Sequence, residues 1–102
     1  MKATIVRYKV KPDRAEENRE YVRAVFAELE HRRPAGLRYV SFNLDDGVTF
    51  IHVAVVDTAN DENPLTETDA FKAFVAAIHD RCDEPPVARL ADSIGVYRLF
   101  DA

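Results

Sequence analysis

Residues 37–56 read LRYVSFNLDDGVTFIHVAVV, and this stretch decides the fold. Two segments rich in β-branched and aromatic residues flank Asp45-Asp46-Gly47. Asp and Gly tolerate the positive φ angles that tight hairpin turns require. The stretch therefore predicts a β-hairpin, with strands at residues 37–44 and 48–56.

On the N-terminal side of the hairpin, the pattern predicts one strand and one long helix. Residues 2–11 alternate between polar and apolar side chains, which is typical of a strand. Pro12-Asp13 stops this strand and begins a helix, because proline is tolerated in a first helical turn. The helix is expected to run to about Arg33 and to end at Pro34-Ala35-Gly36.

On the C-terminal side, the pattern predicts a second helix and a last strand. Thr66 or Thr68 can cap the helix, which is expected to end near Arg81. The stretch Asp83-Glu84-Pro85-Pro86 is interpreted as its terminator, because a residue before proline avoids the helical region. The last strand is then expected at residues 92–100.

The predicted order is β-α-β-β-α-β, the arrangement of the ferredoxin-like α+β fold, as a single domain over residues 1–102. Right-handed crossovers place the strands in an antiparallel sheet of order 4-1-3-2, with both helices on one face. Two helices can cover only one face. Apolar residues nevertheless fall on both parities of the third strand: Phe50, Ala54 and Val56 on one, Ile51, Val53 and Val55 on the other.

The apolar second face predicts a symmetric homodimer in which a second copy covers the sheet. The alternative is a monomer with an apolar sheet face.

Composition restricts other partners. The net charge of −4 argues against nucleic acid, and no segment approaches the roughly 18 apolar residues that span a membrane. The single cysteine, Cys82, and a charge as early as Arg7 predict a cytoplasmic protein without a secretory leader.

Two local motifs connect this pattern to a known family. Gly36-Leu37-Arg38-Tyr39 opens the second strand, and Asp69-Ala70-Phe71-Lys72-Ala73-Phe74 lies in the second helix. With the element order, they resemble the antibiotic biosynthesis monooxygenase (ABM) family of the dimeric α+β barrel superfamily, from about Ala3 to Phe100. The resemblance implies a dimeric barrel and an oxidoreductase: a cofactor-independent monooxygenase of a small aromatic or polyketide-like substrate. The alternative is a non-catalytic barrel that binds a small ligand or is purely structural.

His52 is the first candidate catalytic residue. It lies in the middle of the third strand, between Phe50 and Ala54 on its own parity. Apolar surroundings can tune an imidazole toward the pKa of a general base. The resemblance implies a phenolic substrate whose deprotonated form reacts with dioxygen, with His52 as the base. The alternative is a core or interface histidine that is hydrogen-bonded to a neighbour.

Arg7 and Arg98 are the other catalytic candidates, because both fall in predicted strands that are adjacent in the sheet. Together they would stabilise a developing negative charge. The alternative is that each arginine pairs with an acidic side chain. Substrate-binding candidates are aromatic or apolar residues of the strands and the second helix, which are equally compatible with an ordinary core: Tyr8, Tyr39, Tyr97, Phe71, Phe74 and Ile78.

Metal and haem chemistry find little support in the sequence. His79 and Cys82 lie three residues apart on the second helix, but no third ligand stands at a recognisable spacing. Haem-degrading members of the resembled superfamily use an asparagine on the first strand, a tryptophan and a histidine ligand on the second helix. This chain has Arg7 and Val75 at the first and last of these positions and contains no tryptophan. No cofactor is therefore expected.

Overall fold

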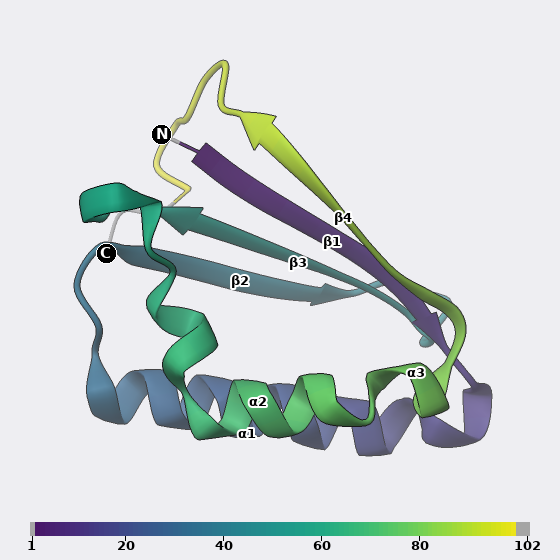
Figure 1. Cartoon of the computed structure of the whole chain (residues 1–102). Coiled ribbons are helices and arrows are strands. Elements are labelled where there is room, and N and C mark those ends of the chain that lie inside the picture. Colours follow the sequence, from purple (N-terminus) through teal and green to yellow (C-terminus); the bar gives the residue numbers. More distant parts are fainter. Residues whose placement is uncertain (1, 100–102) are drawn as a thin grey trace.

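The computed structural model describes residues 2–99 and shows one antiparallel sheet with its helices on a single face (Figure 1). Short 3-10 turns link the main elements at η1 (Pro12–Arg14), η2 (Ala59–Asp61) and η3 (Pro64–Glu67). The main elements are β1 (Lys2–Val10), α1 (Ala15–Arg32), β2 (Leu37–Asn43), β3 (Thr49–Val56), α2 (Asp69–Ala76), α3 (Ile78–Arg81) and β4 (Cys82–Asp92).

The strands lie in the order β2-β3-β1-β4, which confirms the predicted topology and the ferredoxin-like fold class. β1 and β3 form the centre of the sheet, and every neighbouring pair is antiparallel. In this register His52 lies opposite Val6 on one side and Ser41 on the other. The middle of β3 is thus placed at the centre of the helix-covered face.

The prediction for the last strand was wrong. β4 spans Cys82–Asp92 instead of residues 92–100, and it includes Pro85 and Pro86. These prolines are tolerated because β4 is an edge strand, where a missing N–H interrupts no ladder. Residues 93–99 belong to neither a helix nor a strand. The predicted second helix is also divided, at Ala77, into α2 and α3.

The core lies between the sheet and the helices. Every second residue of β1 and β3 points toward α1 and α2, so that strand parity selects the buried set. Asn18 belongs to the same layer although it is polar, and it is 0 % exposed. The buried apolar residues of this cluster are Tyr8, Val10, Ala15, Val25, Phe50, Leu65, Phe74 and Ile78.

Gly36 fixes the path of the chain from α1 into β2. Its φ is +78°, and a Cβ at this position would lie 2.5 Å from the carbonyl oxygen of Asp57. The carbonyl oxygen of Gly36 accepts a hydrogen bond from the backbone N–H of Asp57 at 2.8 Å. Only glycine fits both the left-handed backbone and this close approach. The contact joins the beginning of β2 to the end of β3.

The face of the sheet opposite the helices is apolar and largely open. Phe42 and Val87 on this face are 48 % and 55 % exposed, and Ile5 between them in the sheet is 37 % exposed. The segment that follows β4 adds further apolar surface, because Tyr97 is 83 % exposed. Among the helices of residues 2–99, none is both long and apolar enough to cross a membrane.

Candidate functional site

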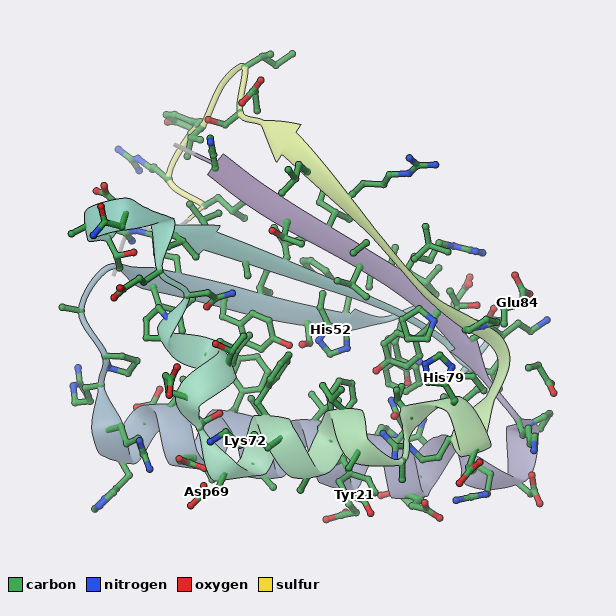
Figure 2. The ribbon with its side chains drawn as sticks, viewed as in Figure 1. Tyr21, His52, Asp69, Lys72, His79 and Glu84 are labelled. Carbon is green, nitrogen blue, oxygen red and sulfur yellow. The ribbon has the colours of Figure 1, made fainter. Side chains whose placement is uncertain are left out.

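A cavity of about 290 Å³ lies between the helix-covered face of the sheet and the α2–α3 segment. Figure 2 shows His52 reaching from the sheet toward the helices, with His79 farther along the same space near α3. The lining contains no aspartate or glutamate among the residues described. It is formed by Thr4, Val6, Tyr8, Tyr39, His52, Ala54, Asn63, Leu65, Phe71, Phe74, Val75, Ile78, His79, Pro86 and Ala88.

His52 is held at the floor of this cavity by hydrogen bonds to both ring nitrogens. Its Nε2 lies 2.8 Å from the hydroxyl of Tyr8 on β1. Its Nδ1 lies 2.6 Å from the hydroxyl of Tyr39 and 2.6 Å from that of Ser41, both on β2. The imidazole is only 4 % exposed. Three neighbouring strands therefore position one side chain.

Behind Tyr8, the hydrogen bonds continue into the helices. Asn18 Nδ2 on α1 donates to the hydroxyl oxygen of Tyr8 at 2.8 Å. Asn18 Oδ1 accepts from Arg81 Nε at 3.1 Å, and Arg81 Nη2 donates to the carbonyl oxygen of Phe74 at 2.9 Å. The guanidinium carbon also lies 4.2 Å from the ring centre of Tyr21. A continuous chain of hydrogen bonds thus connects a buried arginine with the cavity floor.

Sequence reasoning missed both helical members of this chain. Asn18 continues the apolar stripe of α1, since Ala15 and Val22 stand three residues before it and four residues after it. A polar residue at such a position signals a buried hydrogen bond. Arg81 carried no comparable signal, because a cation at the end of a helix is ordinarily solvated and favourable to the helix dipole.

Burial sets the protonation states at the cavity floor. It lowers the pKa of His52 to about 4, so that the imidazole is neutral at pH 7. It raises the pKa of Tyr39 to about 12 and holds the pKa of Tyr8 well above its ordinary value. Both tyrosines therefore keep their hydroxyl protons at pH 7.

Most of the predicted site residues meet in this cavity. His52 and Tyr39 provide polar groups, and the side chain of Tyr8 joins them to Asn18. The predicted wall from the second helix is also present. The cavity lining includes Phe71, Phe74 and Ile78.

Three predicted site residues lie elsewhere. Arg7 has the opposite parity on β1, and its Nη1 lies 3.7 Å from Glu84 Oε1, both side chains being 56 % exposed. Arg98 lies beyond β4 with φ +55°, and its guanidinium contacts the exposed ring of Tyr97 at 5.4 Å. The predicted pairing of Arg7 with Arg98 was wrong, because it depended on placing Arg98 in the last strand. An acidic partner for Arg7, the stated alternative, is confirmed.

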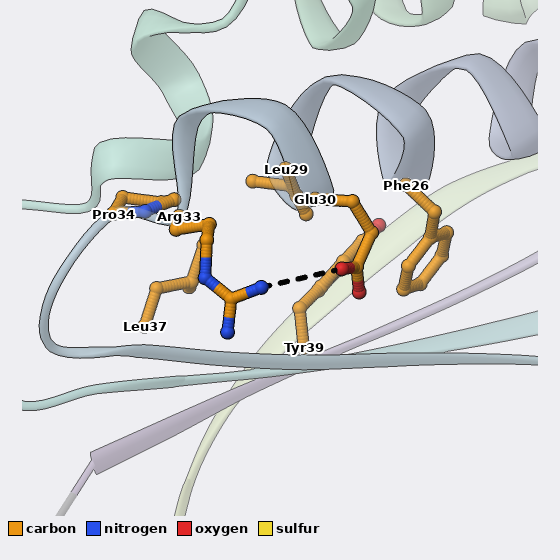
Figure 3. A pocket seen from close by; sticks show the side chains of 7 residues that line it. All are labelled: Phe26, Leu29, Glu30, Arg33, Pro34, Leu37 and Tyr39. Atoms are coloured by element: carbon orange, nitrogen blue, oxygen red, sulfur yellow. Dashed lines mark ion pairs between the residues drawn. The ribbon is translucent and has the colours of Figure 1, made fainter.

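A second hollow of about 330 Å³ lies between the C-terminal end of α1 and β2 (Figure 3). Its charged residues neutralise one another, since Arg33 Nη1 lies 3.7 Å from Glu30 Oε2 and both side chains are about 80 % exposed. The ring of Phe26 stacks on Tyr39 at 5.1 Å, and Tyr39 lines both hollows. Apart from Tyr39, which the two hollows share, the side chains described in this hollow have no buried polar cluster like the one around His52.

Metal ligation has no geometric support in the part of the chain that the structure describes. Within residues 2–99, no three histidine, cysteine or acidic side chains are placed to hold one ion together. His79 lines the cavity, but Cys82 does not. Burial raises the pKa of the Cys82 thiol, which disfavours a metal-binding thiolate.

Comparison with known proteins relates this fold to a set of solved structures. No family model and no curated protein matches the chain. A Nitrosomonas europaea protein, named as a candidate antibiotic biosynthesis monooxygenase, has a TM-score of 0.79 at 24 % identity over 93 % of this chain and 100 % of its own. Rv0793 from Mycobacterium tuberculosis has a TM-score of 0.76 at 16 % identity, covering 93 % and 96 % of the two chains.

A third neighbour carries a functional name. SnoaB from Streptomyces nogalater, described as a cofactor-independent oxygenase, has a TM-score of 0.67 at 15 % identity over 93 % of this chain and 95 % of its own. At sequence identities this low, the structural similarity establishes a shared fold alone. The ferredoxin-like α+β fold of the single chain, which the sequence predicted, is therefore confirmed.

His52 should make the stability of the protein depend on pH. Its pKa in the folded protein, about 4, lies below the value of about 6.5 for an unfolded chain, so the unfolded state binds the proton more readily. The free energy of unfolding should fall as the pH drops from about 6.5 to about 4, by about 3 kcal/mol from this residue. Urea unfolding between pH 7 and about pH 4.5 measures the slope.

The variant His52→Gln isolates this contribution, and His31→Gln is its matched control, because His31 is exposed in the last turn of α1. The dependence of the free energy of unfolding on pH should become weaker in His52→Gln and remain unchanged in His31→Gln. An equal slope in wild type and His52→Gln would contradict the neutral, buried assignment of this imidazole.

Proposed function

We propose that this protein is a cofactor-independent monooxygenase of small, planar phenolic or polyketide-like compounds. The observation that supports this best is the cavity at His52, which combines an aromatic and aliphatic wall with one cluster of hydroxyl and imidazole groups. Such a cavity suits a flat apolar ring with a single oxygen substituent to orient it. The name of SnoaB as a cofactor-independent oxygenase supports the same reaction class.

The chemistry needs no redox group of the protein, because the substrate itself supplies the electrons. A ring methylene activated by a neighbouring phenol or enol reacts with dioxygen. One oxygen atom becomes the new carbonyl oxygen, and the other leaves as water with the two methylene hydrogens. The protein contributes position and electrostatics. Phe71, Phe74 and Ile78 hold the ring, and the hydroxyl of Tyr39 orients the oxygen substituent.

The role of His52 differs from that of a free general base. Both of its ring nitrogens are engaged, and its pKa of about 4 makes it a poor proton acceptor for a phenol. We assign it to holding the hydroxyls of Tyr39 and Ser41 in place. Arg7, Arg98 and Tyr97 have no part in the proposed site, since they lie outside the cavity.

We also propose that a second copy covers the open face of the sheet and forms a homodimer. The centre of this face is apolar, with Ile5, Val53 and Val40 in one row across three strands, and Arg7 and Arg89 lie on the same face. An apolar face of this kind is unfavourable in water. An isologous pairing buries the same patch on both copies at once.

The proposed reaction predicts oxygen uptake by the purified protein with hydroxylated anthrones, in the absence of flavin, haem and added metal. The substitution Ala88→Phe fills the cavity from β4 and should lower kcat/KM at least about tenfold, because the ring loses its space. The matched control, Ala73→Phe, adds the same bulk at an exposed position of α2 and should leave turnover unchanged. Tight binding of these compounds without oxygen uptake would favour the non-catalytic alternative.

The proposed dimer predicts a sedimenting mass of two chains at micromolar concentration. Val53→Glu places a carboxylate between Ile5 and Val40 in the middle of the apolar face and should shift the protein to monomers, since burying an unpaired charge is costly. Ala27→Glu, at an exposed position of α1, is the matched control and should leave the mass unchanged. A wild-type monomer would contradict the proposal.

A further inference from the structure

The hydrogen-bond chain behind the cavity has a fixed direction, because it begins at a group that can only donate. The guanidinium of Arg81 has no acceptor, so it directs Asn18 Oδ1 toward itself. The amide nitrogen of Asn18 must then donate to the hydroxyl oxygen of Tyr8. The proton of that hydroxyl is left to donate to Nε2 of His52, 2.8 Å away.

This direction determines the tautomer of His52. A neutral imidazole carries one proton, and a nitrogen that accepts a hydrogen bond cannot hold it. Because Nε2 accepts from Tyr8, the proton must lie on Nδ1. Nδ1 therefore donates toward the hydroxyls of Tyr39 and Ser41, each 2.6 Å away.

A surplus proton appears at the end of the chain. The protonated Nδ1 has no lone pair, so neither the Tyr39 nor the Ser41 hydroxyl can donate to it. Each hydroxyl accepts from Nδ1–H and therefore keeps its own proton. The Tyr39 proton needs an acceptor other than His52. Tyr39 lines this cavity as well as the second hollow, and Ser41 lines neither, so the Tyr39 hydroxyl is the donor that a ligand in the cavity can reach.

The electrostatics act in the same direction. Arg81 is 0 % exposed, and within residues 2–99 no carboxylate forms an ion pair with it; its Nη1 has no hydrogen-bond partner there. Glu17 on α1 interacts with it at longer range, but that carboxylate is bound to Arg14 at 2.7 Å. The other titratable groups around Tyr8 are His52, Tyr39 and Cys82, and burial keeps all three neutral at pH 7.

We propose that Arg81 and Asn18 are positioning residues that turn the whole chain of hydrogen bonds toward the cavity, so that Tyr39 offers a proton and the substrate binds as an oxyanion. This inference rests on the proposed function and specifies its substrate class: acidic phenols and enols, bound as phenolate or enolate. The phenol or enol proton passes to bulk water when the oxyanion binds, so no side chain of the site has to accept it. A ligand whose only polar group is a donor would find no acceptor at this position.

The test is an anaerobic absorbance titration of bound 4-nitrophenol, whose phenolate and phenol forms have different spectra. In wild type the phenolate should bind about tenfold tighter than the phenol, which lowers the pKa of the bound ligand by about 1. Asn18→Asp reverses the chain, because a carboxylate accepts from both Arg81 and Tyr8. The tyrosine then accepts from Nε2–H, and Nδ1 becomes the acceptor for Tyr39. The preference for phenolate should disappear.

Two further variants keep the result interpretable. Asn43→Asp adds the same negative charge at an exposed position on β2 that is not part of the hydrogen-bond chain, and it should retain most of the phenolate preference. Tyr8→Phe interrupts the hydrogen-bond chain without adding charge. It should weaken the preference for phenolate, and it provides a test even if Asn18→Asp fails to fold. Urea unfolding verifies the fold of each variant.

Several results would overturn the proposal: a wild-type preference for neutral 4-nitrophenol, an unchanged preference in both Asn18→Asp and Tyr8→Phe, or no binding of 4-nitrophenol at millimolar concentration. Oxygen takes no part in this titration. A clear phenolate preference in a protein that shows no oxygen uptake would therefore contradict the proposed reaction and leave the directed chain intact.

Discussion

The buried guanidinium of Arg81 is the constraint on which the rest of the site depends. A charge placed inside a protein is costly unless its donors are satisfied. Here Asn18 Oδ1 and the carbonyl oxygen of Phe74 accept from Nε and Nη2, and the ring of Tyr21 lies against its face at 4.2 Å. Nη1 has no hydrogen-bond partner within residues 2–99. These partners come from α1 and α2, while Arg81 itself ends α3. One side chain therefore connects all three helices.

The same hydrogen bonds that join the helices to the sheet also organise the cavity. Tyr8 crosses from β1 to Asn18 on α1, and His52 connects Tyr8 with the two hydroxyls of β2. Because each link has a fixed donor and acceptor, packing between layers determines which proton faces a ligand. The same interactions therefore stabilise the fold and serve the proposed chemistry. A substitution at Asn18 or Arg81 in the helices should alter the hydrogen bonding of Tyr39.

Strand parity made much of the architecture predictable from sequence. The hairpin at residues 37–56 and the strand order follow from alternation and right-handed crossovers. His52, Tyr8 and Tyr39 meet in one cavity, but alternation alone does not decide which parity faces the helices. Prediction failed at Pro85 and Pro86, which were interpreted as a helix terminator although an edge strand tolerates them. Because of that error, Arg98 was predicted to lie in a strand next to Arg7, and the two arginines were wrongly expected to form a pair.

The helical half of the site could not be predicted for a different reason. Arg81 stands at the end of a helix, where a cation is ordinarily exposed, and nothing local indicates that the turn into β4 buries it. Its partner Asn18 lies 63 residues earlier in the chain. A contact of this kind depends on tertiary packing, so only the folded structure brings the two side chains together.

The protonation of the His52 ring nitrogens in the ligand-free protein tests the account most directly. A nitrogen-15 to proton correlation spectrum at pH 7, assigned with His52→Gln, distinguishes the two neutral tautomers and the imidazolium. The account predicts a proton on Nδ1 and none on Nε2. A proton on Nε2, alone or on both nitrogens, would contradict the directed chain that begins at Arg81.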